Sequence, residues 1–204
     1  MKMNEIPRFI HAKIKLLSDG SPWSRAMLAK LRRGIGKPPG SVPDIWEITI
    51  DGMPEDLLSK DGIPTREEIA IHTALTLYAM HQQGREKPMS VSGNGDDGAH
   101  IGNSFGSAVG KLVKPDKSNE QSVKRRFDAA VTSGDFIELA THARGLIQLL
   151  KAEEIPLDYP QFAKDLFFFQ LPENADRVRL RWGQDFYRTR SYSDNKENNN
   201  KPKE

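Results

Sequence analysis

The chain has 204 residues, no cysteine, and a nearly balanced charge of 30 Lys and Arg against 28 Asp and Glu. The lack of cysteine excludes a disulfide framework and thiolate metal sites. No apolar run is long enough to cross a bilayer, and the first residues lack the apolar core of a signal peptide. We therefore expect a soluble protein of the cytoplasm.

Two helices are predicted at the start of the chain. Apolar residues with helical spacing indicate the first, over about residues 6–17. The second is predicted over about residues 22–33, because Ser21 is a good N-cap residue and Pro22 suits the first helical position. Gly34 then follows as a predicted left-handed stop.

This second helix is predicted to have an apolar side and a cationic side. At about 100° per residue, Arg25, Arg32 and Arg33 fall within one arc, opposite the apolar residues that include Trp23. Lys37 follows in a loop that neighbouring prolines hold extended. The cationic side is suited to a phosphate backbone.

The charges of the first third of the chain are segregated. Residues 1–40 contain nine basic residues against two acidic ones, whereas residues 41–72 contain eight acidic residues against two basic ones. Such segregation lets a chain present a cationic surface while its net charge stays small. The acidic stretch either opposes the basic helix or meets another protein.

Capping motifs predict the starts of most later helices. The segment WEITI, residues 46–50, is predicted as either a short helix or an extended loop. The last helix is predicted over about residues 174–187. The other starts are assigned to Thr65 with Glu68, Ser118 with Gln121, Asp135 with Glu138, and Asp158.

The chain is predicted to be all-α and to divide at the polar segment 114–118. We expect an N-terminal helical half over residues 1–113 and a C-terminal helical bundle over residues 114–192. Residues 193–204 contain no apolar residue and are predicted to be a disordered tail.

No catalytic or metal-binding motif is convincing in this sequence. Residues 93–98 match GxGxxG, but no strand precedes them and two carboxylates lie where a pyrophosphate would approach, so a glycine-rich loop is predicted. The five histidines form no HxxxH or HExxH pair, and His72 and His142 are predicted to be structural. The three phenylalanines at residues 167–169 are predicted to be core rather than a stacking platform for bases.

A second basic centre is predicted near Arg125 and Arg126. On the helix expected there, Phe127 and other apolar residues share one face, so Arg125 points away from it and Arg126 lies on its flank. Arg144 adds a cation on the next helix, and three more recur along the last one, at Arg177, Arg181 and Arg188. Together they suit tracking of a nucleic-acid backbone rather than reading of bases.

Several segments occur in an order that resembles a known family. They are LAKLRRG from residue 28, GKPPG from 36, PDIW from 43, ALTLYA from 74, HQQ from 81, a turn at Gly106, RRF from 125, and WGQDFY from 182. The chain resembles the CasB family, the small subunit of the type I-E CRISPR surveillance complex called Cascade. The resemblance spans about residues 6–188.

The resemblance implies an all-helical protein of two packed bundles, with no catalytic activity and no cofactor. Two copies would lie along the complex and steady the guide–target hybrid and the displaced DNA strand. The implied partners are the guide RNA, the target and displaced DNA strands, other Cascade subunits and a second copy of itself, with no membrane.

Carried over by motif, Arg32, Arg33, Arg144 and at least one of Arg125 and Arg126 match family positions that face nucleic acid. Other residues match in less specific surroundings or belong to the basic helix itself. The complete predicted nucleic-acid-binding set is Arg25, Arg32, Arg33, Lys37, Arg66, Lys87, Arg125, Arg126, Arg144 and Arg177.

One position departs from the family. Many relatives have a basic residue just after the glycine that matches Gly106, where this chain has Ser107. That part of the basic path is therefore open, with Lys111 as the nearby cation. Arg66 is flanked by Glu67 and Glu68, which compete for its charge.

Two other functions are weighed against this one. A purely structural adaptor would direct its basic faces at acidic surfaces of partner proteins. A nuclease would need a carboxylate or histidine cluster, which the sequence does not show. The segregated cations and the resemblance favour a non-catalytic subunit that contacts nucleic acid.

Overall fold

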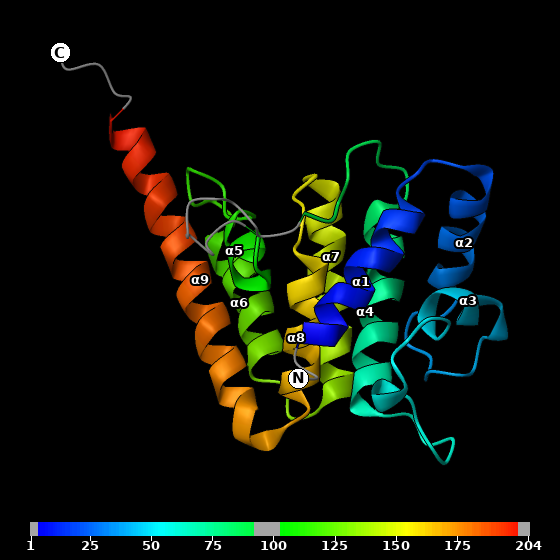
Figure 1. Cartoon of the computed structure of the whole chain (residues 1–204). Coiled ribbons are helices and arrows are strands. Elements are labelled where there is room, and N and C mark those ends of the chain that lie inside the picture. Colours follow the sequence, from blue (N-terminus) through cyan, green and yellow to red (C-terminus); the bar gives the residue numbers. More distant parts are fainter. Residues whose placement is uncertain (1–3, 92–102, 200–204) are drawn as a thin grey trace.

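The computed structural model describes residues 4–91 and 103–199, with side chains to residue 190. The glycine-rich loop predicted at residues 93–98 and the last five residues of the predicted tail lie outside the described residues. Nine α-helices and no β-strand form the described part (Figure 1), which confirms the predicted all-α class. The helices are α1 (Glu5–Leu17), α2 (Pro22–Arg32), α3 (Trp46–Thr49), α4 (Arg66–Gln82), α5 (Phe105–Gly110), α6 (Glu120–Val131), α7 (Phe136–Ala152), α8 (Tyr159–Phe169) and α9 (Pro172–Asn199).

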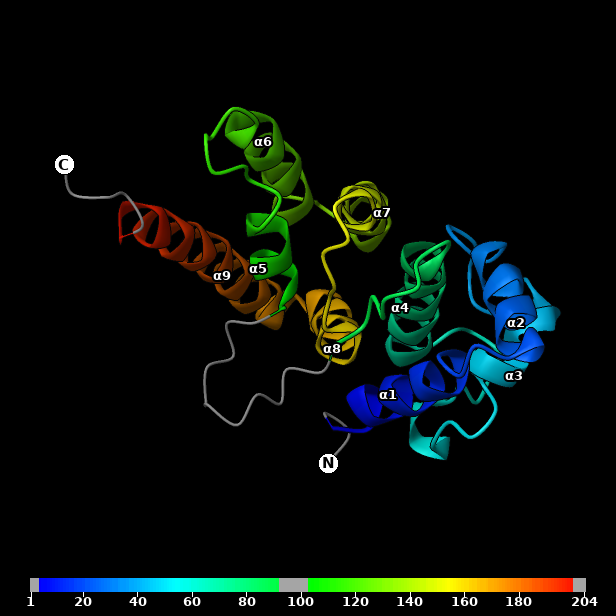
Figure 2. The same cartoon turned by 90° about the horizontal axis from the view of Figure 1, so that it is seen from above.

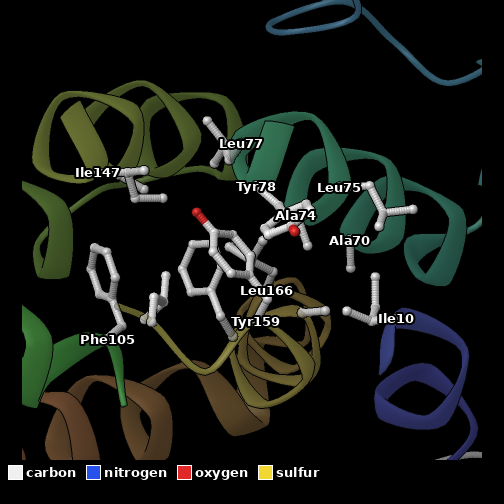
Figure 3. Packing of buried hydrophobic residues seen from close by; sticks show 14 of the residues in the cluster. Ile10, Ala70, Ala74, Leu75, Leu77, Tyr78, Phe105, Ile147, Tyr159 and Leu166 are labelled. Carbon is white, nitrogen blue, oxygen red and sulfur yellow. The ribbon is translucent and has the colours of Figure 1, made fainter. Parts of the chain in front are cut away.

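Helix α4 is the centre of the molecule and contacts α1, α2, α7 and α8. Its predicted capping box is confirmed: Thr65 Oγ1 accepts from the Glu68 N–H at 3.1 Å, and Glu68 Oε2 accepts from the Thr65 N–H at 2.7 Å. Tyr78 of α4 packs edge-on against Tyr159 of α8, with ring centroids 5.3 Å apart (Figure 3). A helix buried on nearly all sides can anchor neighbours from both ends of the chain.

A close contact between helices joins α5 to α9. The residues around Gly106 are predicted as a turn, but they form the buried helix α5. A Cβ at Gly106 would lie 2.0 Å from the Trp182 carbonyl oxygen, and one at Gly110 would lie 2.9 Å from the Phe186 carbonyl oxygen. The two glycines therefore let the helix backbones touch.

Besides Thr65, three predicted N-caps are confirmed and one is wrong. The side chains of Ser21, Asp135 and Asp158 each accept a hydrogen bond from the backbone N–H three residues further on. Ser118 does not cap α6, because its N–H and Oγ both bond to Asp116. Ser118 therefore belongs to a local turn closed by Asp116 and does not cap the helix.

The predicted left-handed stop after α2 is also wrong. The positive φ angles in this loop belong to Gly36, at +74°, and Gly40, at +86°, and not to Gly34. Gly34 is instead needed for space, since a Cβ there would lie 3.0 Å from both Ile45 Cδ1 and Thr76 Cγ2. The loop after α2 is thereby packed directly onto α4.

We expect Gly34→Ala to lower the free energy of unfolding by about 1–2 kcal/mol, because the added methyl group overpacks a buried site. Urea denaturation followed by circular dichroism measures the effect. Gly145→Ala is the matched control, since Gly145 lies within a helix and nothing is within 4 Å of its Cβ position. Equal stability of the two variants would contradict the steric explanation.

The structure resolves or changes three other expectations. WEITI, left open between helix and loop, contains the short helix α3. Trp23, predicted on the apolar side of α2, is 40% exposed. Helix α9 continues to Asn199, past the predicted end near residue 187 and into the segment expected to be disordered from residue 193, because no proline or glycine interrupts it there.

The two helical groups share one core. Figure 2 shows α1 to α4 on one side and α5 to α9 on the other, and α7 and α8 pack against α4 between them. Buried side chains from Ile6 to Phe186 form one continuous cluster. The division at residue 113 stays a prediction; α5, which precedes it, packs against α9. Within the described ranges, no helix combines the length and the apolar character needed to span a membrane.

Candidate nucleic-acid interface

Two exposed arginines stand next to each other on α6. Val123 and Phe127 are buried on the opposite side of this helix, where Phe127 stacks on Phe186 of α9 with ring centroids 4.7 Å apart. Arg125 is exposed, as predicted, and Arg126, predicted on the flank of the apolar face, is exposed as well. Neither guanidinium has an ion-pair partner among the described residues, so both charges are available to a ligand.

Arg125 and Arg126 line a hollow between α6 and α7. His142 lines it from α7, and its Nε2 lies 3.7 Å from Glu138 Oε1. Gly145 leaves the neighbouring turn of α7 without a side chain, and no atom lies within 4 Å of its Cβ position. The hollow thus combines positive charge with unfilled space.

The side of α7 that bears Arg144 leads toward α2. Arg144 is exposed, and Lys151 lies two helical turns further along the same side. The Lys151 Nζ donates to Gln83 Oε1 at 3.2 Å, beside the end of α4. Burial lowers the pKa of Lys151, and the positive charges of Arg85 and Arg32 lower it further. Lys151 therefore connects the cations of α7 with those of α2.

Arg85 and Lys151 were not predicted as binding residues. Arg85 follows α4, and Lys151 lies in the last turn of α7. Only the packing of α2, α4 and α7 brings them near Arg32. Arg85 Nη1 lies 2.9 Å from Glu154 Oε1, and the predicted site residue Lys87 lies 3.6 Å from Glu154 Oε2. Glu154 therefore offsets part of the positive charge at this end.

The cations at the end of α2 occupy different environments. Arg32 is half-buried, and burial lowers its pKa. Arg33 is exposed, with Nη1 3.9 Å from Asp44 Oδ2, a separation that leaves the pair weakly coupled in solvent. Lys37 is exposed and has no ion-pair partner within the described part of the chain. Arg33 and Lys37 are therefore accessible to phosphate.

The acidic stretch at residues 41–72 opposes the basic N-terminal segment at two points. Asp44 lies beside Arg33, and Asp51 Oδ2 lies 3.9 Å from the largely buried Lys13 Nζ. Of the two alternatives, an internal role is thus present in the fold. Its remaining carboxylates are mostly exposed.

Figure 2 shows α6, α7, α4 and α2 following one another across the molecule, and each neighbouring pair is in contact. We call the cations on α6, α7 and the end of α2 the basic row. Six of the ten predicted residues lie on these successive helices or directly after α2. The basic row consists of Arg125, Arg126, Arg144, Arg32, Arg33 and Lys37, with Lys151 added by the structure.

The other predicted residues lie apart from the basic row or are held locally. Arg66 is the first residue of α4, at the end opposite Lys87, and Arg177 is on α9. Arg25 donates from Nε and Nη2 to the Gly20 carbonyl oxygen at 3.1 and 2.8 Å. Two of the guanidinium nitrogens of Arg25 are therefore bonded to the backbone just before α2.

Most arginines of α9 have partners within the protein. Arg181 pairs with the fully buried Asp165, which also accepts from the Trp182 indole at 2.6 Å. Arg179 donates to two backbone carbonyls at the end of α6 and beyond. Arg188 Nη1 lies 3.8 Å from Asp185 Oδ1. Arg181 is therefore engaged by a partner within the fold, and the stripe through Arg177, Arg181 and Arg188 stays a prediction.

The family-specific position after Gly106 does not face solvent in this chain. Ser107 is fully buried, and its Oγ donates to the Ser104 carbonyl oxygen at 3.1 Å. Lys111 is exposed, but its Nζ donates to Asn103 Oδ1 at 2.9 Å. Ser107 therefore adds nothing to a basic surface.

The described residues show no metal site and a structural role for His72. Its Nε2 lies 3.1 Å from the Gly34 carbonyl oxygen in a buried position, as predicted. No group of three or more His, Asp or Glu residues in the described ranges is arranged to hold a metal ion. Phe169 is buried and Phe167 and Phe168 pack against the core, which confirms that prediction.

A match to a family model places this chain among CRISPR-associated proteins. The model of the family described as CRISPR-associated protein Cse2 matches residues 27–187. The chain belongs to this Cse2 (CasB) family. The search of curated protein sequences gave no match.

Solved structures show the same fold. CasB from Thermobifida fusca is 29% identical, with a TM-score of 0.71 over 89% of this chain and 97% of that one. A CRISPR-associated protein of the Cse2 family from Thermus thermophilus is 23% identical, with a TM-score of 0.64 over 90% and 98%. A chain of a CRISPR RNA-guided surveillance complex is 18% identical, with a TM-score of 0.68 over 92% and 96%.

Proposed function

We propose that this protein is the non-catalytic small subunit of a Cascade surveillance complex and that its basic row binds nucleic-acid backbone. The carrying observation is the set of arginines on α6 and α7 that have no ion-pair partner among the described residues, on helices that pack in succession toward α2. Family membership supports the assignment to a CRISPR complex. The bound strands are the guide RNA hybridised to its target and the displaced DNA strand.

The proposed action is energetic. Opening a duplex against a guide RNA exchanges DNA pairs for RNA–DNA pairs of similar stability, so modest contacts to the released strand can shift the balance. Arginine suits this task because its planar fork engages phosphate through two donors. The partners are other Cascade subunits and a second copy of this chain, in the cytoplasm.

We expect Arg125→Ala/Arg126→Ala, and likewise Arg32→Ala/Arg33→Ala, to weaken binding of the isolated protein to single- and double-stranded DNA by about tenfold at low salt. Each lost phosphate contact should reduce the slope of log affinity against log salt by about one. Fluorescence anisotropy across a salt series measures both quantities. Melting temperatures should barely change, because exposed charges contribute little to stability.

The matched control is Arg8→Ala/Lys15→Ala, which removes the same charge from exposed positions of α1, outside the basic row. It should leave the salt slope within experimental error of the wild-type value. Equal losses in the control would assign binding to net charge alone. Normal binding by both row variants would favour the structural adaptor, whose basic faces meet acidic proteins.

A further inference from the structure

The hollow between α6 and α7 is a recessed space, whereas contacts to phosphate need only exposed cations at the surface. Its volume is about 340 Å³, near the lower end of the roughly 300–1,000 Å³ typical of small-ligand sites. Such a space is too small for a duplex. It has room for a group of the size of one nucleobase with part of its sugar.

The lining of the hollow changes from charged to apolar with depth. Arg125 and Arg126 are exposed at its edge, whereas Leu146 is buried and Ala129 and Gly145 are half-buried. Phosphate gains nothing from an apolar floor, because a charged group is poorly solvated there. A flat aromatic base is stabilised by both parts of the lining. It contacts the apolar residues on one side and stacks on a guanidinium plane on the other.

Polar groups around the hollow suit the edge of a base. His142 offers a ring nitrogen and a second flat surface. The Thr141 hydroxyl donates to the Ile137 carbonyl oxygen at 2.8 Å, which leaves its oxygen free to accept from an amino group. These groups do not form a fixed pattern that would select one base.

We infer that this hollow seats one unpaired base of a single-stranded nucleic acid, while Arg125 and Arg126 hold the adjoining phosphates. The inference rests on the proposed function and adds a ligand group to it. A paired base is stacked inside its duplex and cannot enter, so the seat distinguishes a released strand from a duplex. Backbone contacts alone do not make that distinction.

The test compares a thymidine oligonucleotide with a strand of the same length built from abasic residues, which keeps the phosphates and lacks the bases. We expect the wild-type protein to bind the thymidine strand about tenfold more tightly. Gly145→Phe should reduce this ratio to about one, because the new side chain has room to extend into the hollow and removes no charge.

Gly183→Phe is the matched control, since Gly183 is also a helical glycine with nothing within 4 Å of its Cβ position, on α9. It should keep the tenfold ratio. If Gly145→Phe lowers the melting temperature, Gly145→Leu replaces it. Equal wild-type binding of both strands, or a ratio that survives in the Gly145 variants, would overturn the seat and leave backbone binding intact. Binding of neither strand would overturn the proposed function as well.

Discussion

Gly106→Ala is expected to destabilise the protein more than Gly34→Ala does. The new Cβ would meet the Trp182 carbonyl oxygen at 2.0 Å and the Trp182 Cα at 2.8 Å, and these are backbone atoms that no rotamer change can move. α5 must then separate from α9, which exposes Phe105 and other buried residues. We expect a loss of at least about 4 kcal/mol in the free energy of unfolding, measured by urea titration.

Gly183→Ala provides the comparison for Gly106→Ala. Gly183 lies on α9, one residue beyond the contacted Trp182, and its Cβ position is open. Alanine there should stabilise the helix by about 0.5–1 kcal/mol, through the loss of freedom in the unfolded chain. If Gly106→Ala were as stable as Gly183→Ala, the close approach of α5 and α9 would be refuted.

Acid should destabilise the protein through His81. Burial, helped by the positive charges of Lys151 and Arg85, lowers the pKa of this histidine to about 4. Above about pH 6.5 the imidazole is neutral in both states. Between pH 6.5 and 4 the unfolded chain takes up a proton that the folded protein rejects, so the free energy of unfolding falls by about 3 kcal/mol. Below pH 4 this contribution falls no further.

His81→Gln isolates that contribution, because glutamine carries no titrating group. The difference in free energy of unfolding between the wild type and this variant should change by about 3 kcal/mol from pH 7 to pH 4. His11→Gln removes an exposed imidazole and leaves the buried one in place, so the acid loss should remain. A wild-type loss that persists unchanged in His81→Gln would assign the acid sensitivity to other groups.

Local chemistry made most helices predictable from the sequence. The capping box at Thr65 and the caps at Ser21, Asp135 and Asp158 each involve residues within four positions of one another, so their spacing is visible in the sequence. The same spacing at Ser118 gave a wrong prediction, because that serine bonds to Asp116. Helix α5 has only six residues, too few to show a helical period, and its glycines suggest a turn. These glycines let α5 contact the backbone of α9, and that contact depends on Trp182, more than 70 positions away in the sequence.

The binding surface was predictable only in part, for the same reason. Arg125 and Arg126 were identified because the apolar face of their own helix shows which way they point. Arg181 looked equivalent on α9, yet it pairs with Asp165 of α8, a partner that no helical wheel contains. Lys151 was missed because its neighbours come from two other helices.

The basic row also has a length. Packed helices lie about 8–10 Å apart, so the three successive contacts from α6 through α7 and α4 to α2 span roughly 25–30 Å. A strand with the spacing of B-form DNA advances about 3.4 Å per phosphate, and about eight nucleotides therefore cover this distance. At this spacing, a shorter strand does not touch Arg125 and Arg33 at once. The subunit would then respond to how much strand has been released, whatever bases that strand carries.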